Sequence, residues 1–150
     1  MSSRRVNRAM LATTGAVALA AAGCGGGDDG PSSGEFVKQA NVVCKRHYVK
    51  ISAAASKVLA GGKLPDPRQF GKLAQGTIIP EYRAQIAELG AVEPSSDKAA
   101  DYRAWLASSK ALERRLEGNP ALIQNPKALA AVNSQGDALG LSSNCHVGPS

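Results

Sequence analysis

The chain has 150 residues, of which 43% are hydrophobic and 20% are charged, and its formal net charge is +6 at pH 7. This length accommodates one domain. Three of the positive charges are Arg4, Arg5 and Arg8, so residues 24–150 keep a net charge of only +3, scattered among apolar residues. Such a weak and dispersed charge excludes nucleic acid as an expected partner.

The first 23 residues have the pattern of an export signal. Residues 1–8 contain three arginines and no acid, and residues 9–22 form an apolar run. That run is shorter than the roughly 20 residues of a permanent transmembrane helix. The pair Arg4-Arg5 is typical of twin-arginine export, but Asn7 stands where that pattern has a large apolar residue. We therefore favour Sec export.

The signal ends in Ala21-Ala22-Gly23-Cys24, which is similar to a lipobox with Ala21 in place of the usual Leu. We expect residues 1–23 to be a lipoprotein signal peptide. Cys24 then becomes an N-terminal residue that carries acyl chains such as palmitate and attaches the protein to the extracytoplasmic face of the cell membrane. The alternative is ordinary signal cleavage with Cys24 unmodified. Residues 24–34, rich in Gly, Ser and Asp, are expected to form a flexible linker.

Two helices are predicted in the first half of the domain, which spans residues 35–150. Residues 35–60 carry apolar positions three and four apart, and Gly61-Gly62 ends this stripe. A second helix begins at Asp66-Pro67 and extends to residue 89. Pro80 lies inside it and is expected to kink or split it near Ile79, because proline has no N–H and crowds the preceding turn.

Two further helices are predicted in the second half. Ser95-Ser96-Asp97 caps a third helix, which runs through Glu117, and a fourth helix over residues 126–139 is capped by Asn125. No stretch of useful length alternates with the period of a strand. We therefore predict an all-α, up-down-up-down four-helix bundle with a small, alanine-rich core.

Two of the three cysteines are expected to form a disulfide. In an antiparallel bundle the end of the fourth helix returns to the level where the first helix starts, which brings Cys44 and Cys145 to the same end. An exported chain meets an oxidising environment. If Cys24 carries lipid, the other two cysteines pair and no thiol is left over. The disulfide then closes a loop of about 100 residues, worth up to roughly 4.7 kcal/mol.

The segment from Phe36 to Cys44, together with Leu139-Gly140-Leu141 and Cys145, resembles small exported helical lipoproteins of high-GC actinobacteria. The fixed marks of this resemblance are an aromatic residue, an Ala-Asn pair and two cysteines. The resemblance implies the helical fold and the disulfide. It implies no activity and no functional residue.

The two histidines are the most specific candidates for a metal-binding or catalytic site. His47 lies three residues after Cys44, and His146 adjoins Cys145, so a folded bundle could bring two cysteines and two histidines together as a zinc site. Against this, the side chains of adjacent residues, such as Cys145 and His146, rarely bind the same tetrahedral ion without strain. A disulfide flanked by two histidines is the alternative that we favour, and we expect no metal and no other cofactor.

No catalytic motif is found. Ser142 stands where a covalent haem motif has its first cysteine, and the chain has neither a Gly-x-Ser-x-Gly elbow nor a phosphate-binding loop. Its glutamates lie beside basic residues, as surface pairs do. We therefore expect a protein that is not an enzyme and that binds an unknown protein or small molecule. The alternative is a metal protein or enzyme that uses His47 and His146.

Four aromatic residues have two possible roles. They can line a ligand cavity between helices or fill gaps in an alanine-rich core, and we favour the core role. These residues are Tyr48, Tyr82, Tyr102 and Trp105.

Overall fold

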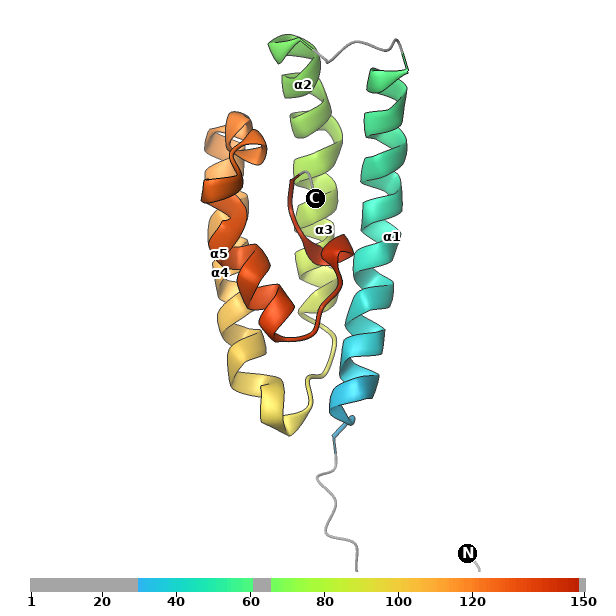
Figure 1. The fold of residues 1–150 in the computed structure, drawn as a ribbon, viewed down its shortest axis with the longest axis vertical. Coiled ribbons are helices and arrows are strands. Elements are labelled where there is room, and N and C mark those ends of the chain that lie inside the picture. Colours follow the sequence, from blue (N-terminus) through green and yellow to red (C-terminus); the bar gives the residue numbers. More distant parts are fainter. Residues whose placement is uncertain (1–29, 61–65, 149–150) are drawn as a thin grey trace, which may run out of the picture.

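The computed structural model describes residues 30–60 and 66–148. The described chain is helical without a strand, and its long helices pack side by side as a four-helix bundle (Figure 1). This confirms the predicted all-α fold. The expected signal peptide and most of the expected linker lie outside the described residues. No described helix is both long enough and apolar enough to cross a membrane.

The first helix, α1, runs from Ser33 to Leu59. Its start is set by a capping box, in which the Ser32 hydroxyl accepts from the Glu35 backbone N–H and the Glu35 carboxylate accepts from the Ser32 backbone N–H. The expected linker of residues 24–34 was therefore too long at its end, because Ser33 and Gly34 are helical. The inward stripe buries four side chains: Phe36, Ala40, Cys44 and His47.

The second long helix consists of three joined segments. They are α2 (Pro67–Leu73), a π-helical turn η1 (Ala74–Ile78) and α3 (Ile79–Leu89). The predicted kink or split near Ile79 is replaced by this π-helical turn, and the chain stays helical through Pro80 (Figure 1). A π-helical turn changes the hydrogen-bond register locally, so the N–H that proline lacks is accommodated without breaking the helix.

The third helix, α4 (Ala99–Gly118), follows a 3-10 turn η2 (Ser96–Lys98). A second 3-10 turn, η3 (Pro120–Gln124), leads into α5 (Pro126–Ala138), whose cap is the Asn125 side chain, as predicted. Because α5 is short, it ends partway along the bundle. The chain then crosses toward α1 through the 3-10 turn η4 (Ser143–Cys145), and Figure 1 shows this crossing near the middle of α1.

An aromatic cluster fills the core between the first turns of α1 and the first turns of α4. Phe36 meets Tyr102 edge to face with ring centroids 4.7 Å apart, and Tyr102 stacks on Trp105 at 5.7 Å. Tyr102 donates a hydrogen bond to the Leu89 carbonyl, and Trp105 donates to the Val132 carbonyl. The single-atom side chain of Gly136 lets α5 approach the Trp105 indole closely.

Candidate functional site

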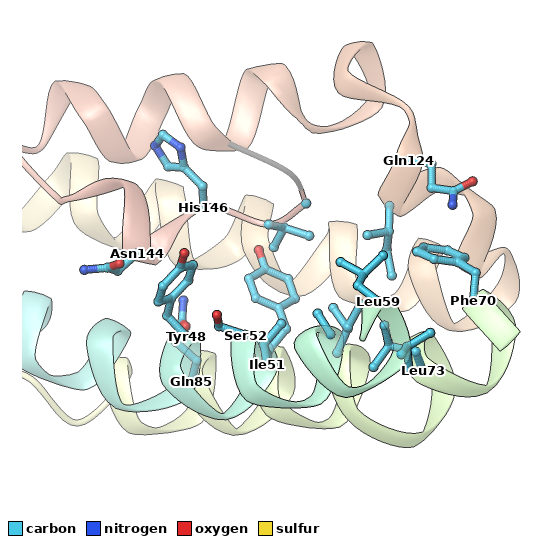
Figure 2. A pocket seen from close by; sticks show the side chains of 17 residues that line it. Tyr48, Ile51, Ser52, Leu59, Phe70, Leu73, Gln85, Gln124, Asn144 and His146 are labelled. Atoms are coloured by element: carbon cyan, nitrogen blue, oxygen red, sulfur yellow. The ribbon is translucent and has the colours of Figure 1, made fainter. Parts of the chain in front are cut away.

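A groove of about 470 Å³ opens beside the second half of α1. One side is formed by α1, the floor by α2, η1 and α3, and the remaining wall by η3 and the end of the chain (Figure 2). The lining is mainly apolar, with a few amide and hydroxyl groups. Its 17 residues are Tyr48, Ile51, Ser52, Ala55, Val58, Leu59, Phe70, Leu73, Ile78, Tyr82, Gln85, Ile123, Gln124, Asn144, His146, Val147 and Gly148.

Residues 140–148, which we call the strap, supply one wall of this groove. The strap is joined to α1 by the Cys44–Cys145 disulfide, with the two Cα atoms 4.8 Å apart. The predicted pairing is therefore confirmed. Its position differs from the expectation, because the strap reaches the middle of α1 and not its start.

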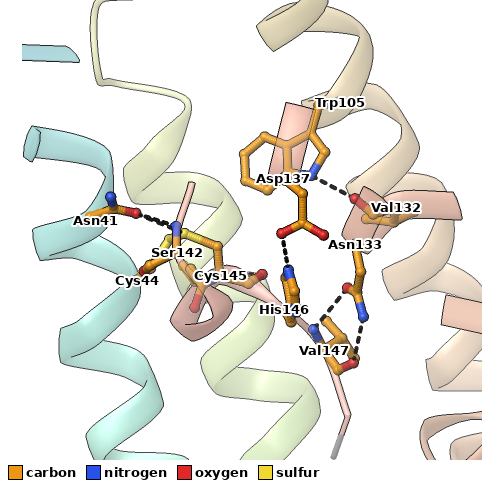
Figure 3. Close-up of polar contacts among 11 residues, drawn as sticks. Asn41, Cys44, Trp105, Val132, Asn133, Asp137, Ser142, Cys145, His146 and Val147 are labelled. Atoms are coloured by element: carbon orange, nitrogen blue, oxygen red, sulfur yellow. Dashed lines mark hydrogen bonds and ion pairs between the residues drawn. A yellow bond between two sulfur atoms is a disulfide. The ribbon is translucent and has the colours of Figure 1, made fainter. Parts of the chain in front are cut away.

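Two asparagine side chains on the helices hold the strap through three hydrogen bonds (Figure 3). Asn41 accepts a hydrogen bond from the Ser142 backbone N–H at 2.7 Å. Asn133 accepts from the backbone N–H of Val147 at 3.2 Å and donates to its carbonyl at 3.3 Å. One carboxamide thus satisfies both backbone groups of one residue, which fixes the register of the strap against α5.

Two glycines shape the strap. Gly140 has φ +84° and Gly148 has φ +89°, in the left-handed region that favours glycine. Gly140 follows the end of α5 and turns the chain toward α1. A Cβ on Gly148 would overlap the Leu129 side chain and lie 2.9 Å from the Ile123 carbonyl oxygen. Position 148 therefore needs glycine for both its backbone angle and its close packing.

Gln85 and Tyr82 of α3 lie at the bottom of the groove, and both are buried. The Gln85 amide donates to the Cys145 carbonyl at 3.4 Å. Burial raises the pKa of Tyr82 to about 12; Ser109 opposes this shift and the Glu113 carboxylate adds to it. The Tyr82 phenol therefore stays protonated at neutral pH and contributes no charge to the groove.

His47, one of the predicted site residues, is buried at the α1–α3 contact. Its Nδ1 lies 2.6 Å from a Glu81 carboxylate oxygen, and its Nε2 lies 3.2 Å from Glu88 without hydrogen-bond geometry. Burial tends to raise the pKa of Glu81, but hydrogen bonds from His47 and Lys50 outweigh it and lower that pKa. Arg46 pairs with Glu88 at 2.5 Å. These residues form an ion-pair network that joins the two helices.

His146, the other predicted histidine, belongs to a different environment. Its Nε2 lies 2.8 Å from the Asp137 carboxylate of α5 (Figure 3). Figure 2 shows the ring on the side of the strap away from Tyr48 and Ser52. Each histidine thus has its own carboxylate partner, and Cys44 and Cys145 are consumed by the disulfide. Among residues 30–60 and 66–148, no three His, Cys, Asp or Glu side chains are grouped in a way that could hold a metal ion.

The four aromatic residues divide between the two predicted roles. Tyr48 and Tyr82 line the groove, while Tyr102 and Trp105 lie in the core. Sequence reasoning missed the strap residues that complete the site, Asn144, Val147 and Gly148. Phe70 and Leu73 lie within the second predicted helix, but a helix prediction does not reveal which apolar residues border an open groove.

Comparison of the chain with protein-family models, with curated proteins and with solved structures finds no match. The site must therefore be interpreted from its own chemistry.

Proposed function

We propose that this chain is a non-catalytic binding module that takes a small apolar molecule into the groove. In this proposal, lipid on Cys24 holds the domain at the extracytoplasmic face of the cell membrane. The resemblance to small exported lipoproteins supports that location. The groove supports binding of a small molecule over the alternative of a protein partner.

The observation that carries the binding proposal is the combination of volume and lining. Sites for small molecules usually measure about 300–1,000 Å³ and are mainly apolar, with a few placed polar groups. The groove, at about 470 Å³, falls in this range and has such a lining. Its walls come from separate parts of the chain that hydrogen bonds and a disulfide hold together. A site fixed in this way needs little ordering when a ligand enters.

The support for lipid attachment comes from the cysteines and the leader. Cys44 and Cys145 are paired with each other. An exported chain with three cysteines then has Cys24 left over, and this residue follows an export signal and a lipobox-like sequence.

Titration with toluene and with hexanol, heptanol and octanol tests the binding proposal. The protein is the polypeptide of residues 24–150 with Cys24→Ser, which keeps every described residue and carries no lipid. We expect saturable binding, with affinity rising about fourfold per methylene until the groove is filled. In ¹H–¹⁵N NMR spectra the shifts should centre on Ile51, Leu73 and Val147.

Two variants and a matched control sharpen this test. Leu73→Asn places a carboxamide on the apolar lining, and Ala55→Phe fills the space; both should abolish binding. Val42→Asn makes a similar change on an exposed part of α1 outside the groove and should leave binding unchanged. Absence of saturable binding, or equal binding by Leu73→Asn, contradicts the proposal.

Metabolic labelling with an alkyne fatty acid in an actinobacterial host tests the anchor. The full-length chain should incorporate the label, and Cys24→Ala should not. A Cys44→Ala, Cys145→Ala double variant is the control and should still be labelled. Label that persists in Cys24→Ala would show that this cysteine is not the lipid site.

A further inference from the structure

Polar groups gather at one end of the groove. Figure 2 shows the side chains of Tyr48, Ser52 and Gln85 close together below the strap. The Tyr48 and Ser52 hydroxyls make no hydrogen bond to any other described residue. The buried Gln85 carboxamide donates a hydrogen bond to the Cys145 carbonyl. This end therefore has two hydroxyl groups free to donate to, or accept from, a ligand.

The other end of the groove is apolar. In Figure 2 the side chains of Leu59, Phe70 and Leu73 lie together there, with the Gln124 carboxamide beside Phe70. Leu59 is 46% exposed at this end. Covering such surface with an apolar ligand is favourable. The groove therefore has hydroxyl groups at one end and apolar side chains at the other.

Formal charge is absent from the lining. Among its 17 residues there is no Lys, Arg, Asp or Glu, and the one titratable base, His146, turns to Asp137. The Glu81 and Glu88 carboxylates near the α1–α3 contact are already paired with His47, Lys50 and Arg46. An ionised ligand would therefore lose its hydration without meeting an opposite charge, which is costly.

From these observations we infer that the groove binds an uncharged amphiphile. Its hydrocarbon body lies toward Phe70 and Leu73, and its single hydroxyl or carbonyl group bonds to Tyr48 and Ser52. This inference rests on the proposed function and names the chemical class of its ligand. A fatty acid anion, an alkylammonium ion and a phosphorylated lipid head are disfavoured by the same lining.

Three probes with the same chain length and different charge test this class: 1-octanol, octanoate and octylammonium at pH 7. Each is titrated into the polypeptide of residues 24–150 with Cys24→Ser, by calorimetry and ¹H–¹⁵N NMR. We expect octanol to bind at least tenfold more tightly than either ion. Toluene, which has no hydrogen-bonding group, serves as the reference for purely apolar binding.

Two variants test the orientation. Tyr48→Phe and Ser52→Ala each remove a hydroxyl while keeping nearly the same shape. Each should weaken octanol binding about two- to tenfold, the worth of one hydrogen bond, and leave toluene binding unchanged. Ser56→Ala is the matched control, since Ser56 is an exposed residue of α1 that does not line the groove.

The outcomes separate this inference from the proposed function. If octanoate or octylammonium binds as tightly as octanol, the uncharged class is wrong while the binding module stands. If Tyr48→Phe and Ser52→Ala both leave octanol binding unchanged, the proposed orientation is wrong. If neither toluene nor any octyl probe binds saturably, the proposed function fails and this inference fails with it.

Discussion

Replacing Cys44 and Cys145 together with alanine tests whether the disulfide holds both the fold and the groove. The two cysteines lie 101 residues apart in the sequence, and both are buried. The substitution keeps these positions apolar and leaves the helices unchanged. It removes the covalent link between α1 and the strap, whose residues form one wall of the groove.

The size of the effect follows from the loop that the disulfide closes. A loop of about 100 residues corresponds to about 4.7 kcal/mol in the chain-entropy model. A domain of this size is usually stable by only about 5–15 kcal/mol. The strap keeps its hydrogen bonds to Asn41 and Asn133, each worth about 1 kcal/mol. We therefore expect the free energy of unfolding to fall by about 3–5 kcal/mol and toluene binding to weaken at least tenfold.

Urea denaturation measures this change, with Trp105 as the probe because it is the only tryptophan of the chain and is buried. For an m-value of about 2 kcal/mol/M, the midpoint should fall by about 2 M. The parent protein in reductant should match the double variant, and Cys24→Ser alone should not change the midpoint. A shift below about 0.5 M at unchanged m would refute the argument from loop closure.

Three further predictions concern the strap and the α1–α3 contact. Gly148→Ala should lower the free energy of unfolding by about 2–4 kcal/mol in urea denaturation and weaken toluene binding, because the new Cβ overlaps Leu129 and the φ angle is unfavourable. Gly140→Ala has an unfavourable φ angle too, but its Cβ meets only the Val37 methyl groups at 3.6 Å or more, so it should cost about 1–2 kcal/mol. Equal costs would contradict the packing argument. Asn133→Ala should cost about 1–3 kcal/mol because it removes both hydrogen bonds to Val147, while Ser134→Ala, a change at an exposed neighbour on α5, should cost less than about 0.5 kcal/mol. Because the pKa of Glu81 is lowered in the folded state, its contribution to stability is present above about pH 4.5 and is lost as pH falls through the lowered value. Glu81→Gln should therefore flatten the fall in urea midpoint below about pH 4.5, relative to Glu93→Gln at an exposed carboxyl. An unchanged pH profile would show that the pairing with His47 and Lys50 does not stabilise the fold.

The helices were predictable because local chemistry determines where they begin and which face they bury. Asp66 and Asn125 accept hydrogen bonds from backbone N–H groups at the helix starts, as capping residues do. Leu129, Val132 and Gly136 lie three and four positions apart on α5, and all three are buried. The predicted start of α1 at residue 35 is two residues late, because its capping box of Ser32 and Glu35 lies in a segment whose glycine and serine content favours a linker.

The groove could be predicted only in part, because the sequence of the strap, which forms one of its walls, has no periodic pattern of apolar residues. The strap is held by tertiary contacts from Asn41, Asn133 and the disulfide. Asn41 and Asn133 occur on helices, where a polar residue usually indicates a solvated face. His47 shows the same limit, since its burial depends on carboxylates 34 and 41 positions away in the sequence that only the folded chain brings near.

The small side chains of α1 beside the groove bear on why this space exists. Ser52 and Ala55 are half-buried and border the groove, opposite the strap. Larger apolar residues at these positions would add buried contact. The predicted alanine-rich core is wrong, because only Ala40 and Ala74 are alanines among the described buried hydrophobic residues, and most of the others are large. The small residues Ser52 and Ala55 face a strap that is held by the Cys44–Cys145 disulfide and by the Asn133 side chain. The fold thus fixes two opposite sides of a space that a small apolar ligand can fill, which supports the proposed function.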